Sequence, residues 1–395
     1  MRKIFVAVVF LILLSTNANA ADFKHSWEWE ILAVPPSSGW DSEPGHSISN
    51  ALAWCEREIA ASGSGVGGHD IKFTRLVLLS DDQNLRSLSL NITPRVLAVM
   101  SFQNYDGDRI LIERLAGREV PLFLAGGENV LIEQGGRPLA NIFALDLFRD
   151  YRCSAFAEYA KKIFAGGKDI RMALAASRFT VNQEREAKIC YDILDKNGFM
   201  PMPFWTDASV RDTFNMMSEE IESQENNPGI MISFLGSMGS REVWRNFMRL
   251  NTKWQLWNCS APENAYLSCR GMVLADQNIK LNEVGGFENL KRQIWNTRAL
   301  AIMDNVYAGR AVALVEWLKR GVNSLPQPVN TIPRGALLRS LEHVRDIPFG
   351  NQTLNINPIL HRPERRNIYL VEVRNKMYRL LDTLNIAGMK FTNVY

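Results

Sequence analysis

The sequence predicts an α/β protein made of two doubly wound parallel-sheet lobes. Short apolar or β-branched runs alternate with helical segments over residues 29–144, and the same alternation starts again at Ile170. Strand–helix–strand units in series make parallel sheets, because each helix carries the chain back to the edge where the next strand begins. Two such runs therefore indicate two lobes, with a seam near Arg149.

The first run contains five expected strands separated by helical segments. Each strand is short and rich in Val, Ile, Leu or Phe, and helices are expected over residues 48–61 and 81–90 and from Asp106 onward. The expected strands are residues 29–34, 70–79, 95–100, 120–124 and 141–144.

The second run repeats this alternation and is followed by a different pattern of elements. Its expected strands are residues 170–175, 199–204, 229–234 and 252–257, with helices over 155–164, 182–197, 210–224 and 241–250. A returning strand at 272–276, helices over 287–320 and 336–346, and antiparallel strands at 354–356 and 367–373 complete the chain. A mixed end of this kind suits a chain that crosses between lobes more than once.

The carboxyl ends of the strands are the expected binding edge, because open parallel sheets bind ligands beyond those ends. One first-lobe strand is followed by Ser101, Phe102 and Gln103, and the next by Ala125, Gly126 and Gly127. The first group offers hydroxyl and amide groups, and the second offers bare backbone.

Aromatic residues follow other strands, as expected for the wall of a small-ligand cleft. They are Trp40, Phe179 and Phe234. For each of them, packing in a core is the alternative interpretation.

The first twenty residues have the pattern of a secretory signal peptide. Arg2 and Lys3 precede an apolar run over residues 4–14, and Ala18-Asn19-Ala20 forms a cleavage signal. We expect residues 1–20 to be removed and the protein to be exported to the periplasm; the alternative is an uncleaved anchor. No later stretch is long and apolar enough to span a membrane.

Composition excludes some classes of partner. The chain is 46% hydrophobic and 22% charged, which is ordinary for a globular protein, and its net charge is +3. Without Arg2 and Lys3 the charge is +1. A near-neutral chain lacks the basic footprint of a nucleic-acid-binding protein, so the expected partner is a small molecule or another protein.

The odd number of cysteines leaves at least one without an intramolecular disulfide partner. Cys259 and Cys269 flank a short polar segment and are the favoured pair. Cys153 and Cys190 lie at or on consecutive predicted helices and are a second candidate pair, and Cys55 is expected to be a buried thiol. No spacing resembles a zinc site.

Catalytic motifs are missing from the sequence. No G-x-S-x-G elbow or H-E-x-x-H occurs, and the glycine run at residues 63–68 follows a helix rather than a strand, so it does not suit a phosphate. The sequence therefore predicts no cofactor, no metal and no enzymatic activity. An exported hydrolase remains a rival hypothesis, which turnover of a bound solute would support.

Four features together resemble a known family. They are the exported start, the helix at residues 50–60 with its glycine turn and following strand, the unit at 95–129, and the segment LEHVRDIPFG at 341–350. Their order resembles the type I periplasmic solute-binding proteins, the branch that includes the leucine/isoleucine/valine-binding receptors of ABC importers. The resemblance implies lobes that are joined by three crossings and close on a ligand at a hinge. One lobe would comprise residues 21–147 plus about 275–347, and the other 148–274 plus about 348–395.

The resemblance also implies ligand contacts and a partner. Residues 101–103 and 125–127 would bind a carboxylate, and Trp40 would form a wall. Second-lobe contacts would come from Phe179 or Val181, Phe234 and Asn258. The chain departs from the family pattern because no acidic residue near Asn258 matches the one that meets an amino-acid ammonium group, and the usual second-lobe tyrosines are missing. The partner would be an ABC permease in the inner membrane; a sensing or accessory role without transport is the alternative.

Overall fold

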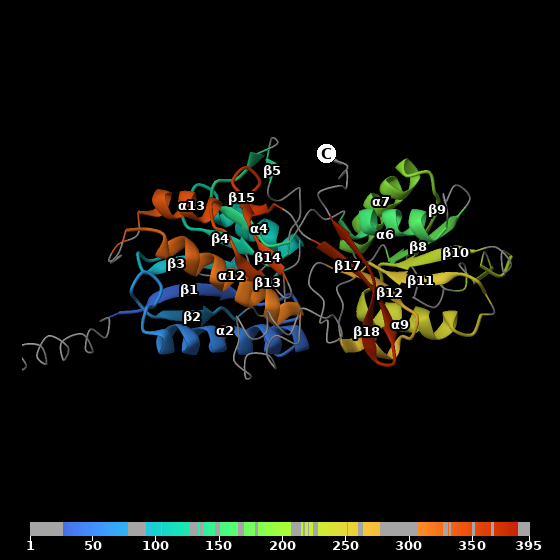
Figure 1. The fold of residues 1–395 in the computed structure, drawn as a ribbon, viewed down its shortest axis with the longest axis horizontal. Coiled ribbons are helices and arrows are strands. Elements are labelled where there is room, and N and C mark those ends of the chain that lie inside the picture. The colour runs from blue at the N-terminus through green and yellow to red at the C-terminus, as the bar shows by residue number, and fades with distance from the viewer. Residues whose placement is uncertain are drawn as a thin grey trace, which may run out of the picture.

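The computed structural model describes most of the chain in two lobes (Figure 1). The described residues are 27–77, 92–103, 105–126, 133–134, 137–146, 151–164, 170–177, 181–206, 215, 218–219, 221–223, 228–250, 252–259, 264–276, 306–326, 331, 333–349, 352–364 and 367–385. The helices expected at 81–90 and, in most of its length, at 210–224 lie outside them, as do residues 1–26.

The first lobe contains a five-stranded parallel sheet in the order β2-β1-β3-β4-β7. Its strands are β1 (Trp29–Val34), β2 (Ile71–Arg75), β3 (Val96–Ser101), β4 (Leu122–Leu124) and β7 (Ile142–Ala144). Helices α2 (Glu43–Ser62), α12 (Val306–Asn323) and α13 (Arg334–Glu342) share one apolar cluster with one sheet face, and α4 (Tyr105–Leu115) covers the other. A short pair, β5 (Glu133–Gln134) with β6 (Arg137–Pro138), lies between β4 and β7 in sequence.

The second lobe contains a seven-stranded sheet in the order β18-β17-β12-β11-β10-β8-β9. Its parallel strands are β8 (Arg171–Ser177), β9 (Met200–Thr206), β10 (Gly229–Ser233), β11 (Gln255–Asn258) and β12 (Val273–Asp276). Helices α6 (Tyr151–Ile163) and α7 (Val181–Lys196) cover one face, and α9 (Gly236–Phe247) with the short η1 (Asn264–Ser268) covers the other.

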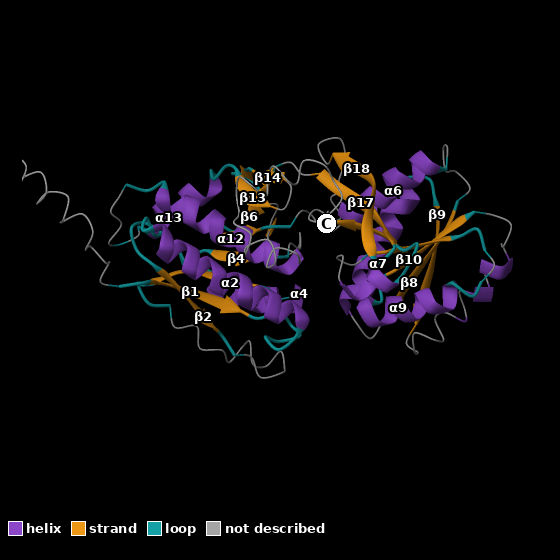
Figure 2. Cartoon of the chain, turned by 60° about the horizontal axis from the view of Figure 1, so that its bottom comes forward, coloured by secondary structure: helices purple, strands orange, loops and turns teal. Residues whose placement is uncertain are grey.

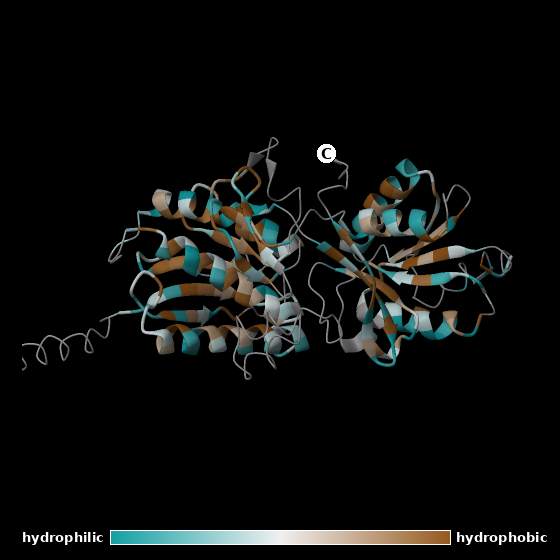
Figure 3. Cartoon of the chain, in the orientation of Figure 1, coloured by the Kyte–Doolittle hydropathy of each residue, from teal (hydrophilic) through white to brown (hydrophobic). Residues whose placement is uncertain are grey.

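The five parallel strands of each sheet follow the same order in space, so the predicted fold class is confirmed. In both lobes the first strand lies between the second and third, and the fourth and fifth follow outward. Figure 2 shows helices on both sides of each sheet, and Figure 3 shows that the strands are largely hydrophobic. A sheet covered on both faces needs apolar side chains on both, which explains the continuous apolar runs in the sequence.

The C-terminal strands pair differently from the prediction. β13 (Ile347–Phe349) pairs with β14 (Gln352–Leu354), and β15 (Ile356–Asn357) with β16 (Arg362–Pro363). β17 (Asn367–Arg374) pairs with β12 and with β18 (Met377–Asn385). The predicted pairing of residues 354–356 with 367–373 is therefore wrong.

The segment after residue 347 stays with the first lobe for longer than expected. Ile347, Phe349, Leu354 and Ile356 belong to the same apolar cluster as helix α12. Because these alternating side chains are buried there, the chain passes to the second lobe only between β16 and β17, rather than near residue 348.

The cysteines correct the favoured pairing. The disulfide joins Cys153 to Cys190, and Cys55 is a buried thiol, as expected. Cys259 and Cys269 do not pair. Cys259 lies in the cluster on one face of the second-lobe sheet and Cys269 in the cluster on the other, so the sheet separates them.

Helix α2 begins at Glu43 rather than at Ile48. The Gly45 amide donates to Ser42 Oγ at 3.1 Å, and a proline follows in the first turn. A serine cap and an early proline are favourable at a helix start, because the first amides have no partner within the helix.

Candidate ligand-binding site

The carboxyl ends of three neighbouring first-lobe strands meet at one edge of the sheet. Ser101, the last residue of β3, is in register with Val34 on one side and Leu124 on the other. The residues that follow these strands therefore start from adjacent positions, as the sequence predicted.

The Ser101 hydroxyl has two partners within the lobe. It donates to Asp108 Oδ1 at 2.5 Å and accepts from the Gln103 amide at 3.2 Å. Both Ser101 and Asp108 are buried. The hydroxyl thus fixes the turn between β3 and α4, and its geometry is that of a positioning group.

Gln103 ties the ends of β1 and β3 together. Its Nε2 donates to the Pro35 carbonyl at 2.5 Å. A Cβ on Gly107 would overlap the Gln103 side chain, so the glycine at the start of α4 leaves room for this amide. The fixed side chain is half-buried beside the turn that Ser101 holds.

Beyond β4 the backbone is open. The Ala125 amide donates to the Ser101 carbonyl at 2.9 Å, and Ala125 is 6% exposed. Gly126 is half-buried, and a Cβ added to it would meet no atom within 4 Å. Gly126 is therefore where a ligand could approach the main chain closely; Gly127 lies outside the described residues.

The two aromatic residues of this edge lie differently. Trp40 is half-buried, packs against the first-lobe core, and donates from Nε1 to the Leu76 carbonyl at 2.9 Å. Phe102 is a member of that core and is 8% exposed. Of the two, Trp40 has more surface left for a ligand.

The second-lobe candidates lie at the equivalent edge of their own sheet. Phe234 is 2% exposed and belongs to the lobe core, which is the alternative that the sequence left open. Asn258, the last residue of β11, is fully buried; its Nδ2 donates to Met272 Sδ at 3.6 Å. Its Oδ1 has no hydrogen-bond partner in the described part of the chain. Phe179 falls outside that part.

Sequence reasoning missed a serine pair that repeats the first-lobe turn. Ser233 ends β10, its Oγ lies 2.8 Å from Ser240 Oγ in α9, and it accepts from the Leu235 amide at 3.4 Å. The signal was present in the sequence: in both lobes a serine at the strand end precedes its polar helix partner by seven residues.

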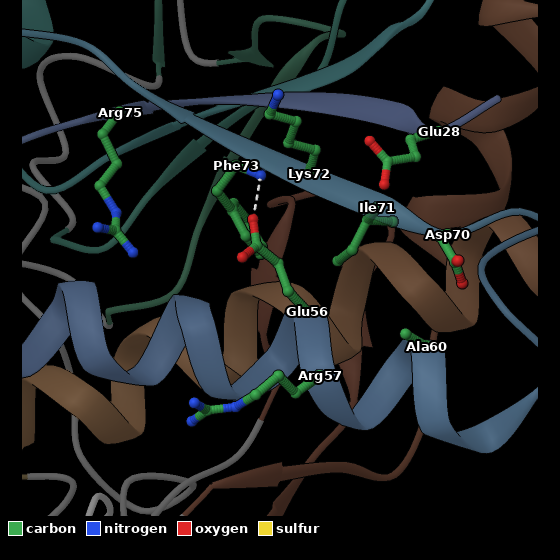
Figure 4. Close-up of a pocket in the computed structure, with 9 residues that line it drawn as sticks. All are labelled: Glu28, Glu56, Arg57, Ala60, Asp70, Ile71, Lys72, Phe73 and Arg75. Atoms are coloured by element: carbon green, nitrogen blue, oxygen red, sulfur yellow. Dashed lines mark hydrogen bonds between the residues drawn. The ribbon is translucent and has the colours of Figure 1, made fainter.

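A cavity of about 640 Å³ lies elsewhere, beside the outer strand β2 and helix α2 (Figure 4). Its lining is mostly charged, and the Phe73 amide donates there to Glu56 Oε1 at 2.6 Å. None of the candidate residues lines it. The lining residues are Glu28, Glu56, Arg57, Ala60, Asp70, Ile71, Lys72, Phe73 and Arg75.

The described residues contain neither a metal-ligand cluster nor a membrane-spanning helix. Within those ranges, no group of three or more His, Cys, Asp and Glu side chains is placed to hold a metal ion. None of the described helices has both the length and the apolar character needed to cross a membrane.

Comparison with solved structures identifies the fold. A leucine-binding protein from Thermotoga maritima matches 91% of this chain and 100% of its own at 12% identity, with a TM-score of 0.69. A solute-binding protein of an ABC transporter from R. palustris, in complex with benzoate, matches 90% and 96% at 14% identity, with a TM-score of 0.70. A fatty-acid ABC transporter substrate-binding protein from Thermomonospora curvata matches 90% and 91% at 12% identity, with a TM-score of 0.68.

The chain therefore has the two-lobed fold of the type I periplasmic solute-binding proteins. No protein-family model and no curated protein matches the sequence. The shared fold locates the edges that could bind a ligand, and the ligand must be argued from the residues on those edges.

Proposed function

We propose that this protein is an exported solute-binding receptor of an ABC importer, which holds a small carboxylate-bearing ligand between its lobes by hinge closure. The observation that carries the proposal is the convergence of the β1, β3 and β4 ends at one edge, where Gly126 leaves the main chain open. Solved structures with this fold include complexes with leucine and benzoate.

The residues favour a ligand that carries a carboxylate but no ammonium group. The side chain at the end of β11 is the neutral amide of Asn258, whose buried Oδ1 accepts no hydrogen bond from the described residues. A buried carbonyl oxygen without a donor is costly, and a ligand hydroxyl would satisfy it. We therefore favour aromatic or aliphatic acids, including hydroxylated ones, over α-amino acids.

The proposed contacts divide into direct and positioning roles. Trp40, Gln103, Ala125, Gly126 and Gly127 would line the first-lobe side, with Ser101 and Phe102 holding their turn. Phe179 and Asn258 would contribute from the second lobe, with Phe234 supporting them from the core. The ligand would be released unchanged to a permease in the inner membrane. Residues 1–20 would direct export and be removed, which N-terminal sequencing at Ala21 would show.

Thermal shift and calorimetry test the proposal. The panel is benzoate, 3,4-dihydroxybenzoate, medium-chain fatty acids and leucine, with benzamide as the uncharged match to benzoate. A ligand at 100 times its Kd stabilises the folded state by about 2.7 kcal/mol. We expect a shift with at least one acid and none with benzamide; no shift across the panel contradicts the proposal.

A pair of variants places the site. Gly126→Leu would fill the open space at the carboxyl end of β4 and abolish the shift. Ala116→Leu, an exposed position in the loop that enters β4 from its other end, would leave it unchanged. Equal loss of the thermal shift in both variants would show that the ligand does not bind at the proposed edge.

A further inference from the structure

Two aspartates occupy equivalent positions where the chain leaves each sheet. Leu124 pairs with Ala144 in the first lobe, and Asn258 pairs with Leu274 in the second. Asp146 and Asp276 each lie two residues beyond the second member of these pairs. After each aspartate the chain passes to the other lobe, into helix α6 after Asp146 and helix α12 after Asp276.

Each aspartate is paired with an arginine from the helix that enters its lobe. In the second lobe, Arg152 Nη2 donates to Asp276 Oδ2 at 2.7 Å, and Arg152 Nε donates to the Ala275 carbonyl at 3.1 Å. In the first lobe, Arg310 Nη2 lies 3.0 Å from Asp146 Oδ2. The same pairing of an aspartate with an arginine therefore occurs once in each lobe.

Arg310 also reaches across the lobes. Its Nη2 lies 4.0 Å from Asp276 Oδ2, an oxygen that also accepts from the Tyr151 hydroxyl at 3.3 Å. The Arg310 side chain is 11% exposed and that of Asp276 is fully buried. Burial alone lowers the pKa of Arg310, but Asp146 and then Asp276 raise it above its usual value. The guanidinium therefore stays charged, and water screens these contacts only weakly.

The two ion pairs are unequal in quality. Arg152 makes hydrogen bonds, whereas Nε and Nη2 of Arg310 and Oδ1 of Asp146 lack a well-oriented hydrogen bond within the described residues. A buried charged group with incomplete hydrogen bonding is costly and gains from a better arrangement. The first-lobe pair is thus the one suited to rearrange.

We propose that Arg310 exchanges partners between Asp146 of its own lobe and Asp276 of the other lobe as the lobes turn. The cluster of Asp146, Arg152, Asp276 and Arg310 would thereby set the balance between lobe orientations. The inference rests on the proposed hinge closure and concerns its control. A rotation that brings Arg310 closer to Asp276 gains a cross-lobe ion pair, and one that separates them returns Arg310 to Asp146.

Two variants separate these states. Asp146→Asn removes the competing charge and leaves Arg310 to Asp276, so the cross-lobe contact is strengthened. The double variant Arg310→Gln with Asp146→Asn removes the contact without leaving an unpaired aspartate in the first lobe. Because coupled charges of this kind interact strongly enough to shift such an equilibrium, we expect the ratio of orientations to change at least about twofold, in opposite directions.

Pulsed electron paramagnetic resonance on the ligand-free protein measures that ratio. Spin labels at Glu58→Cys on α2 and Lys188→Cys on α7 report the distance between lobes; both positions are exposed, and the native thiols are buried. Arg320→Gln is the matched control, because Arg320 lies on α12 and pairs with Glu316 of the same helix. Thermal unfolding confirms that each variant folds.

Opposite shifts of the two variants, with an unchanged control, support the proposal. Distance distributions like that of the wild type, shifts in the same direction, or an equal shift in the control overturn it. The measurement uses no ligand, so failure to find a solute would contradict the proposed function and leave this result standing.

Discussion

In the first lobe, helix α2 packs on α12 in an apolar cluster that includes Cys55, whereas in the second lobe α7 is joined to α6 by the Cys153–Cys190 disulfide. The strand-end turns differ in the same way: Ser101 bonds a carboxylate at Asp108, and Ser233 bonds a hydroxyl at Ser240. The shared strand order thus determines where these contacts form. The chemistry that stabilises each of them is particular to the lobe.

Loss of the disulfide should cause the largest difference in stability between the two lobes. The bond closes a loop with a sequence separation of 37, and the chain-entropy relation gives about 4 kcal/mol for a loop of that length. We expect Cys190→Ser with Cys259→Ser to lower the stability of the second lobe by this amount. Hydrogen exchange of α6 and α7 amides would show it, with α2 amides unchanged as the internal control.

When Cys190 is removed and Cys259 is retained, Cys259 should take the place of Cys190 in the disulfide. The Cys259 Sγ lies 3.7 Å from the Cys153 Sγ, so a small movement suffices to form a bond of about 2.05 Å. We expect the single variant Cys190→Ser, refolded with glutathione disulfide, to form Cys153–Cys259 and regain part of the lost stability. Peptide mapping without reduction would detect the pair; two thiols at these positions would contradict the prediction.

The two serine turns give the next largest contrast. Hydrogen bonds to charged groups contribute about 1.5–3 kcal/mol, and neutral ones about 1 kcal/mol. Asp108→Ala should therefore destabilise the first lobe by about 2–3 kcal/mol, and Ser240→Ala the second lobe by about 1 kcal/mol. Urea unfolding monitored by hydrogen exchange of the β3 and β10 amides separates the two. Equal losses would show that the carboxylate adds nothing to its turn.

Much of the fold followed from the sequence because both lobes are built from local strand and helix patterns. Strand β1 runs over Trp29–Val34 as predicted, since its apolar run ends at two prolines. Pairings between distant segments did not follow: β17 pairs with β12, and nothing in the local pattern of residues 367–373 distinguishes that partner from residues 354–356.

For the candidate site, the sequence indicated which residues follow which strands but not where their side chains point. Ser101 follows β3 as expected, yet its hydroxyl faces Asp108, which depends on how α4 packs. For Phe234 the sequence left both a cleft wall and a core position open, and only the folded chain shows that the side chain is buried in the core. The pairing of Arg310 with Asp146 joins residues far apart in sequence, so only the folded chain shows it.

The outer strand β2 of the first lobe gives a smaller, local effect. Its Phe73 amide points away from the sheet and donates to Glu56 Oε1, which protects an edge that could otherwise pair with another strand. Glu56→Ala should remove a hydrogen bond of about 1 kcal/mol and speed exchange of the Phe73 amide about fivefold. Glu58→Ala, on the same helix, is the control and should leave that exchange rate unchanged.

The edges of β7 and β12 are covered in different ways in the two lobes. β17 pairs along the edge of β12 in the second lobe. In the first lobe, His361 covers the edge of β7: the Ala144 amide donates to the His361 carbonyl, and His361 Nδ1 lies 3.1 Å from the Ile142 carbonyl. The buried ring also stacks on Phe143 with centroids 5.0 Å apart. One edge thus depends on an ionisable group and the other on strand pairing.

Acidification should therefore weaken the first lobe by a small amount and leave the second unchanged. Burial lowers the pKa of His361 below its ordinary value of 6.5, although Glu342, 3.4 Å away, opposes this. The unfolded chain then binds the proton first, so the stabilisation is complete above pH 6.5 and is lost as the pH falls toward the folded-state pKa. Hydrogen exchange of β7 and β12 amides at pH 7.5 and 5.5, corrected for intrinsic rates, measures the difference. His361→Asn, which tolerates the positive φ of 49°, should abolish it, and greater protection of β7 at the lower pH would contradict a lowered pKa for His361.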